Sequence, residues 1–120
     1  IESGVLATPE LIAQATQLAL DAGADFVKTS TGKTPVSATP EAAAVMLREI
    51  AASGSPSAGF KASGGIRSVP DAKLYLDLAA AALGAEALTA QRFRFGASGL
   101  LNDIEAVLAG EASAPSTSAY

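Results

Sequence analysis

The chain has 120 residues, a net charge of −4 at pH 7, and neither cysteine nor histidine. That length allows one domain at most. The absence of cysteine and histidine excludes disulfides, imidazole or thiolate metal sites, and Ser-His or Cys-His catalysis. The negative net charge argues against a general nucleic-acid binder. No apolar stretch is long enough to span a bilayer and the first residues show no secretory signal, so we expect a soluble, cytoplasmic protein.

Helical periodicity alternates with short apolar runs along the chain. In chain order these patterns predict a helix at Pro9–Ala22, a strand at Asp25–Thr29, a helix at Pro40–Ala52, a strand at Ala58–Ala62, a helix at Pro70–Leu83, a strand at Phe93–Gly96 and a helix at Ser98–Leu108. Ile1 and Glu2 resemble the end of an earlier strand. We therefore predict βα repeats over residues 1–109 and a flexible Ala/Ser/Pro-rich tail over residues 110–120.

The predicted helices share start and stop signals. Proline stands at the first helical position, where an N–H is unpaired in any case, and the acidic residue that follows it complements the helix dipole. Glycine ends each of the same helices as an expected left-handed cap. The prolines are Pro9, Pro40 and Pro70, and the glycines are Gly23, Gly54 and Gly84. Together with the similar spacing of the strands, these signals predict parallel strands joined by right-handed crossovers.

Lys28 ends an apolar run that is typical of a buried strand. Lysine is almost never fully buried without a partner, because removing an ammonium from water is costly. A lysine in this place can lose its proton and attack a carbonyl to form a Schiff base. Lys61 lies at the matching place on the next predicted strand, and two neighbouring ammonium groups disfavour each other's charge. The alternative is that both side chains extend from strand ends into solvent.

Glycine-rich turns follow the second and third strands. Gly64 and Gly65 precede Arg67, and Gly96 precedes Ser98 at the start of a helix. Exposed backbone N–H groups and the positive end of a helix can hold an anion, and ligands of βα folds lie at this carboxyl edge of the strands. These turns therefore indicate a phosphate site, with ordinary tight turns as the alternative.

Two other residues have open interpretations at this point. Lys33 is either a phosphate ligand or a solvated loop lysine. Tyr120 is either a mobile acid–base group or an ordinary disordered terminal residue.

Three segments together resemble the deoxyribose-phosphate aldolase family. They are residues 24–33 (Ala-Asp-Phe-Val-Lys-Thr-Ser-Thr-Gly-Lys), residues 59–67 (Gly-Phe-Lys-Ala-Ser-Gly-Gly-Ile-Arg) and residues 94–98 (Arg-Phe-Gly-Ala-Ser). The terminal Tyr120 also matches, and the resemblance covers essentially the whole chain. It implies a cofactor-free class I aldolase on a (β/α)8 TIM barrel, which reversibly cleaves 2-deoxy-D-ribose 5-phosphate to acetaldehyde and D-glyceraldehyde 3-phosphate in deoxyribonucleotide catabolism.

The resemblance also implies the roles of individual residues. Lys28 would be the Schiff-base lysine, Lys61 the lysine that perturbs it, and Tyr120 a group that reaches the site from the tail. The residues implied to bind the substrate and its phosphate are Thr31, Gly32, Lys33, Gly64, Gly65, Ile66, Arg67, Gly96 and Ser98.

The chain departs from the family pattern in two local features and in its length. Gly99 stands where many members have a second serine, which removes one phosphate contact, and Ala62-Ser63 replaces a common Pro-Ala. Family members are about twice as long, so the chain corresponds to the C-terminal half of the barrel, from late in strand five to the tail. The N-terminal half, which supplies a proton-relay aspartate, is then an implied partner.

Two alternative functions remain open from the sequence. The chain could be a non-catalytic phosphate-binding half-barrel that self-associates, for example as a homodimer, or it could be another class I aldolase. The expected small-molecule partner is a phosphorylated sugar or an aldehyde, whereas nucleic acid and membrane are not expected partners.

Overall fold

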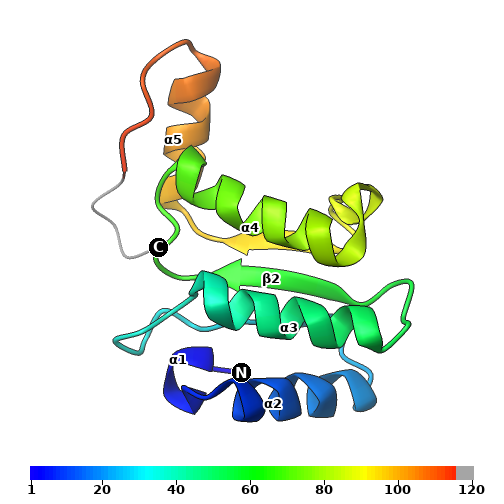
Figure 1. The fold of residues 1–120 in the computed structure, drawn as a ribbon. Coiled ribbons are helices and arrows are strands. Elements are labelled where there is room, and N and C mark those ends of the chain that lie inside the picture. The colour runs from blue at the N-terminus through cyan, green and yellow to red at the C-terminus, as the bar shows by residue number, and fades with distance from the viewer. Residues whose placement is uncertain (116–120) are drawn as a thin grey trace.

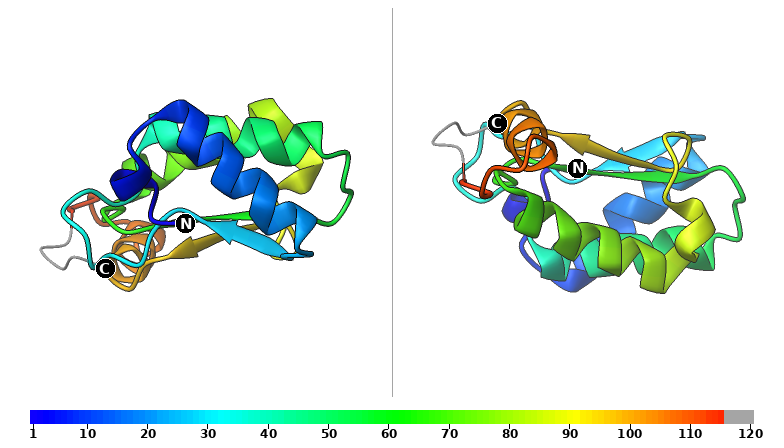
Figure 2. Two further views of the ribbon diagram at one scale, coloured as in Figure 1. Left: turned by 90° about the horizontal axis from the view of Figure 1, so that it is seen from below. Right: turned by 90° about the horizontal axis from the view of Figure 1, so that it is seen from above.

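The computed structural model describes residues 1–115 and shows an α/β fold in which helices cover one face of a parallel sheet (Figures 1 and 2). The elements in chain order are α1 (Ser3–Leu6), α2 (Pro9–Asp21), β1 (Phe26–Lys28), α3 (Pro40–Ala52), β2 (Gly59–Ser63), α4 (Val69–Leu83), the 3-10 helix η1 (Ala85–Ala87), β3 (Phe93–Gly96) and α5 (Gly99–Leu108). The sheet has three strands in the order β1-β2-β3, and both pairs are parallel. The predicted alternation of helices with parallel strands is confirmed.

The two faces of the sheet differ in what covers them. Val27 pairs with Phe60 and Phe60 with Phe93, and these three side chains are buried beneath the helices. Successive strand residues point to opposite faces. Lys28, Lys61 and Arg94, one position further along, therefore lie on the opposite face. None of the helices in residues 1–115 covers that face (Figure 2).

Local signals explain where the long helices begin. Thr8 and Thr39 cap α2 and α3, each accepting a hydrogen bond from a backbone N–H of the first turn. Ser68 caps α4 and forms a reciprocal capping box with Asp71. Such a cap is typically worth about 1 kcal/mol. Helix α4 begins at Val69, so Pro70 occupies the second helical position and not the predicted first one.

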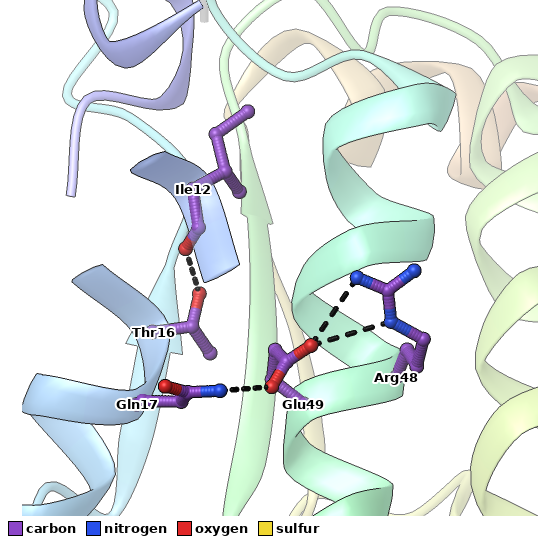
Figure 3. Close-up of polar contacts among 5 residues, drawn as sticks. All are labelled: Ile12, Thr16, Gln17, Arg48 and Glu49. Carbon is purple, nitrogen blue, oxygen red and sulfur yellow. Dashed lines mark hydrogen bonds and ion pairs between the residues drawn. The ribbon is translucent and has the colours of Figure 1, made fainter. Parts of the chain in front are cut away.

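Helices α2 and α3 are joined by polar contacts at their surface (Figure 3). Gln17 Nε2 donates to Glu49 Oε2 at 2.6 Å, and Arg48 pairs with Glu49 at 3.2 Å. Deeper in α2, the buried Thr16 hydroxyl donates to the Ile12 carbonyl at 2.7 Å. Within the described residues, this helix layer packs on the side of the sheet opposite the lysine-bearing side.

The structure differs from the sequence prediction mainly at short elements. Ile1 and Glu2 do not form a strand, because Glu2 has left-handed backbone angles of φ 51° and ψ 59°. Helix α1 and the 3-10 helix η1 were not predicted, since four and three residues are too few to show a helical period. None of the helices in residues 1–115 has the length and apolar character needed to cross a membrane.

Candidate active site

Three cations form one row across the open face of the sheet. Lys28 is the register partner of Lys61, and Lys61 is the register partner of Arg94. Lys28 and Lys61 are half-buried, whereas Arg94 is exposed. The structure thus places the two predicted lysines side by side on neighbouring strands, near the carboxyl edge of the sheet.

The Lys61 side chain leans toward β3. A Cβ atom placed on Gly96 would lie 3.2 Å from Lys61 Cε and 2.4 Å from Ser63 Oγ. Any side chain at position 96 would therefore push against both groups. The predicted site residue Gly96 acts here by leaving room for its neighbours.

Arg94 was not predicted as a site residue; it ends the row at β3, and its side chain points away from the carboxyl edge. Its guanidinium lies 4.1 Å from the centre of the Phe26 ring, and its Nε donates to the Ala90 carbonyl at 3.1 Å. The Phe26 ring in turn covers Gly59, where an added Cβ would lie 2.5 Å from the ring. The alternation of residues along β3 could have placed Arg94 on the lysine face, because it lies one position after the buried Phe93.

Buried hydroxyl groups tie the carboxyl ends of the strands together. Thr29 Oγ1 donates to the Ser63 carbonyl at 3.1 Å and accepts from the Ser63 N–H at 3.0 Å. Ser30 Oγ also donates to the Ser63 carbonyl, and Ser63 Oγ donates to the Gly96 carbonyl at 3.2 Å. Thr29, Ser30 and Ser63 are all essentially inaccessible to solvent. The Thr-Ser that follows Lys28 therefore fixes the backbone beside the lysine.

The loop after β1 packs against the loop after β2 at the same edge (Figure 2). Gly64, with φ of +87°, approaches this loop so closely that an added Cβ would lie 2.6 Å from Ser37 Oγ and 3.6 Å from Gly32 Cα. Gly65 has φ of +81° and open space around the position of a Cβ. Gly32 and Gly64, both predicted phosphate ligands, are thereby brought together, and the predicted ligand Gly65 follows Gly64 directly in the chain.

Glu2 was not predicted as a site residue, although it binds this loop directly. Its Oε1 accepts from the Thr31 backbone N–H at 2.9 Å, and its Oε2 lies 3.2 Å from Thr34 Oγ1. Hydrogen bonds from the Thr31 side chain and backbone and from Thr34 hold the pKa of Glu2 below its ordinary value. The backbone N–H of Thr31, a residue predicted to bind the substrate, is therefore occupied by a carboxylate.

The loop after β2 places its predicted residues in different surroundings. The Ile66 side chain is buried in the core, so only its backbone could face a ligand. The Arg67 backbone N–H donates to Asp71 Oδ2 at 3.2 Å, while its buried Nε has no hydrogen-bond partner among residues 1–115. A buried, unpartnered guanidinium N–H is costly unless an anion or water binds it.

The remaining predicted residues lie around the same edge or beyond it. Ser98 is exposed at the start of α5, and Lys33 is exposed in the loop after β1. Tyr120 falls outside the described residues.

The beginning of the predicted tail is held by Asp103 of α5. The Asp103 carboxylate accepts from Ser113 Oγ at 2.6 Å and from the Ala114 N–H at 2.7 Å, and it also accepts from the Val69 N–H at 2.6 Å. These donors, with Ser113 foremost, hold the pKa of Asp103 below its ordinary value.

The arrangement brings two lysines and glycine-lined loops to one edge of the sheet, where an amine could act as a nucleophile and the loops could accept a small anion. Among residues 1–115, no group of three or more acidic side chains is placed to hold a metal ion.

Comparison with known proteins shows the family and the fold of the chain. The family described as DeoC/LacD family aldolase matches residues 2–106. Two crystal structures of a proposed deoxyribose-phosphate aldolase from Toxoplasma gondii ME49 are similar in fold, one at 1.8 Å resolution and one of the apo form at 1.37 Å resolution. The first has a TM-score of 0.82 at 20% identity and is matched over 93% of this chain and 46% of its own. The second has a TM-score of 0.78 at 22% identity, with coverage of 88% and 41%. This chain therefore spans less than half the length of those proteins.

Proposed function

The chain belongs to the DeoC/LacD aldolase family, and on this basis we propose that it is the lysine-bearing C-terminal half of a class I deoxyribose-phosphate aldolase. The observation that supports the proposal most directly is the pairing of Lys28 with Lys61 on neighbouring parallel strands, beside glycine-lined loops. Family membership and the half-barrel fold agree with an aldolase, while the substrate is part of the proposal.

In the proposed reaction the neutral Lys28 amine attacks the C1 aldehyde of open-chain 2-deoxy-D-ribose 5-phosphate. Loss of water leaves a protonated Schiff base, which withdraws electrons from the neighbouring carbons. The C2–C3 bond breaks as the C3 hydroxyl loses its proton, and the bonding pair moves toward the imine to form an enamine. Glyceraldehyde 3-phosphate leaves, the enamine is protonated at C2, and hydrolysis returns acetaldehyde and the Lys28 amine.

Lys61 is the proposed electrostatic partner of Lys28. It lies one strand away in exact register, and its side chain runs past Gly96 toward the carboxyl edge. Both lysines are half-buried, where two neighbouring charges would interact more strongly than in bulk water. Tyr120 is the proposed acid–base contact from the tail.

The proposed phosphate site is the junction of the three loops at the carboxyl edge. The close approach of Gly32 to Gly64 and the unpartnered Nε of Arg67 support it. Lys33, Gly65 and Ser98 would complete the set, with the ammonium, the backbone and the helix start as the respective donors.

We further propose that an N-terminal barrel half completes the enzyme. The sheet described here ends at β1 and β3, and parallel strands in this family of folds close into a barrel. In the two similar aldolase structures, the part that this chain matches makes up less than half of the protein. Below, the assembled barrel means this chain together with that N-terminal half.

The experiment that tests the reaction is borohydride trapping with acetaldehyde, using the assembled barrel. We expect a reduced two-carbon adduct on Lys28 by peptide mass mapping, and no adduct in the Lys28→Ala variant. If the unmodified assembled barrel forms no adduct on Lys28, the aldolase proposal is wrong. The isolated chain serves as a comparison, because the proposal expects it to turn over substrate only with its complementary half.

A second candidate function is a non-catalytic phosphate-binding half-barrel that associates with itself. Within residues 1–115, the outer edge of β3 favours it, since an unpaired strand edge can pair with another copy, whereas the end of β1 is already bonded by Ile1 and Ser3. Phosphate binding without trapping at Lys28, together with a concentration-dependent dimer of the chain, would favour this candidate over the aldolase.

A further inference from the structure

We propose that Glu2 is a positioning residue that holds the loop after Lys28 in the shape required to receive the substrate's phosphate. This inference rests on the phosphate site of the proposed function. Glu2 would touch neither the reacting carbons nor the phosphate, and would act through the loop Thr31–Thr34.

The backbone around Glu2 is pinned to the end of β1. The amino group of Ile1 donates to the Lys28 carbonyl at 2.9 Å, and the Ser3 N–H donates to the Thr29 carbonyl at 2.9 Å. Between these two bonds, Glu2 adopts left-handed backbone angles that residues other than glycine rarely adopt. This conformation, fixed on both sides, directs the carboxylate toward the loop that follows the lysine.

Both carboxylate oxygens face donors of the loop. Oε1 accepts from the Thr31 N–H at 2.9 Å, and Oε2 lies 3.2 Å from Thr34 Oγ1. Thr34 Oγ1 also lies 2.9 Å from the Val36 carbonyl, and a hydroxyl donates its single proton to one of these acceptors at a time. The hydrogen bonds hold the pKa of Glu2 below its ordinary value, so the carboxylate is ionised at neutral pH.

The negative charge of Glu2 cannot itself attract a phosphate, because like charges repel. Its benefit must therefore come from geometry. On its other side the loop contacts the turn at Gly64, where a Cβ atom added to Gly64 would lie 3.6 Å from Gly32 Cα. If Glu2 releases the loop, Gly32 and Lys33 lose their fixed position relative to Gly64 and Gly65.

The test compares Glu2→Ala, Glu2→Gln and Glu2→Asp in the assembled barrel. Inorganic phosphate is the probe, and its dissociation constant is measured by calorimetry. Borohydride trapping of acetaldehyde on Lys28 is measured in parallel. We expect Glu2→Ala to weaken phosphate binding about tenfold, the size of one charge-assisted hydrogen bond, while trapping changes by less than about twofold.

The glutamine variant separates geometry from charge. Its amide oxygen can accept from the Thr31 N–H, and its NH2 can donate to Thr34 Oγ1, which then donates to Val36. We expect it to bind phosphate within about threefold of the unmodified protein, whereas the shorter aspartate should resemble alanine. The Gln and Asp variants provide the same test should the alanine variant fail to fold.

Unchanged phosphate affinity in both Glu2→Ala and Glu2→Asp would overturn the inference. Tighter phosphate binding in both Glu2→Ala and Glu2→Gln would also overturn it, because that would mean that Glu2 acts only through its charge. Failure of the aldolase proposal is seen separately, as a missing Lys28 adduct in the unmodified protein, and the phosphate titration still reports on Glu2 in that case.

Discussion

Replacing Thr29 by valine tests how the strand end that carries Lys28 is held. Valine keeps the branched shape of threonine but removes the hydroxyl that donates to the Ser63 carbonyl and accepts from the Ser63 N–H. The carbonyl keeps a partner in Ser30 Oγ, whereas the buried N–H loses the Thr29 hydroxyl that accepts from it. An unsatisfied buried polar group costs about 1–3 kcal/mol, and complete burial of Ser63 places the expected loss at about 2–3 kcal/mol.

Thr29→Ser is the matched control for this prediction. Serine keeps both hydrogen bonds and loses one buried methyl group, which costs about 1 kcal/mol. Urea unfolding followed by circular dichroism measures both free energies, and equal m values show that the comparison is sound. We also expect the valine variant to trap acetaldehyde on Lys28 less efficiently than the serine variant.

The reasoning would be refuted if the serine variant were as unstable as the valine variant or more so. Packing of the methyl group, and not the hydroxyl network, would then hold the end of β1. Equal stability of all three proteins would show that the network contributes nothing measurable.

Three further predictions follow from other parts of the molecule. Gly59→Ala should destabilise the fold by about 1–3 kcal/mol in urea unfolding, because its Cβ would overlap the Phe26 ring, and a Phe26→Leu background should reduce that loss. Asp103→Asn should increase amide hydrogen exchange around Ser113. Because the folded pKa of Asp103 is lowered, its stabilising effect is present above the unfolded pKa and is lost as pH falls through the folded pKa. If the free energy of unfolding falls in the same way at acid pH in the variant and in the unmodified protein, this prediction is wrong. Burial, foremost, and nearby acidic residues raise the pKa of Tyr75 to about 12. Ultraviolet titration should therefore show a phenol that ionises about two pH units above the ordinary tyrosine value, and this transition should be missing in Tyr75→Phe. The stability that Tyr75 contributes should be lost as pH rises from 10 through 12.

The sequence predicted the long elements well because their signals are local. Helix α3 begins and ends where its proline, acidic residue and apolar spacing indicated, and β3 has its predicted bounds. The lysine on β1 was also legible, because an apolar run that ends in lysine is unusual in any fold. Caps, turns and periodicity depend on residues within a few positions of one another.

The site itself was predicted only in part. The glycine turns and Arg67 carried a recognisable pattern, whereas Glu2 and Arg94 had no local signal of function. Glu2 lies 29 residues before the backbone group that it binds, and nothing in its neighbours indicates that distance. The buried hydroxyl of Ser63 likewise had the appearance of an ordinary loop serine.

The sequence by itself therefore determined which segments form helices and strands and which lysine is out of place. Only the tertiary structure decided that Thr29 bonds Ser63 from 34 residues away, that the Arg94 guanidinium lies over the Phe26 ring, and that Glu2 binds the loop beyond Lys28. The physical reason is that hydrogen bonds within a turn or helix are set by neighbouring residues. Contacts between strand ends depend instead on how the helix layer packs and fixes the register of the sheet.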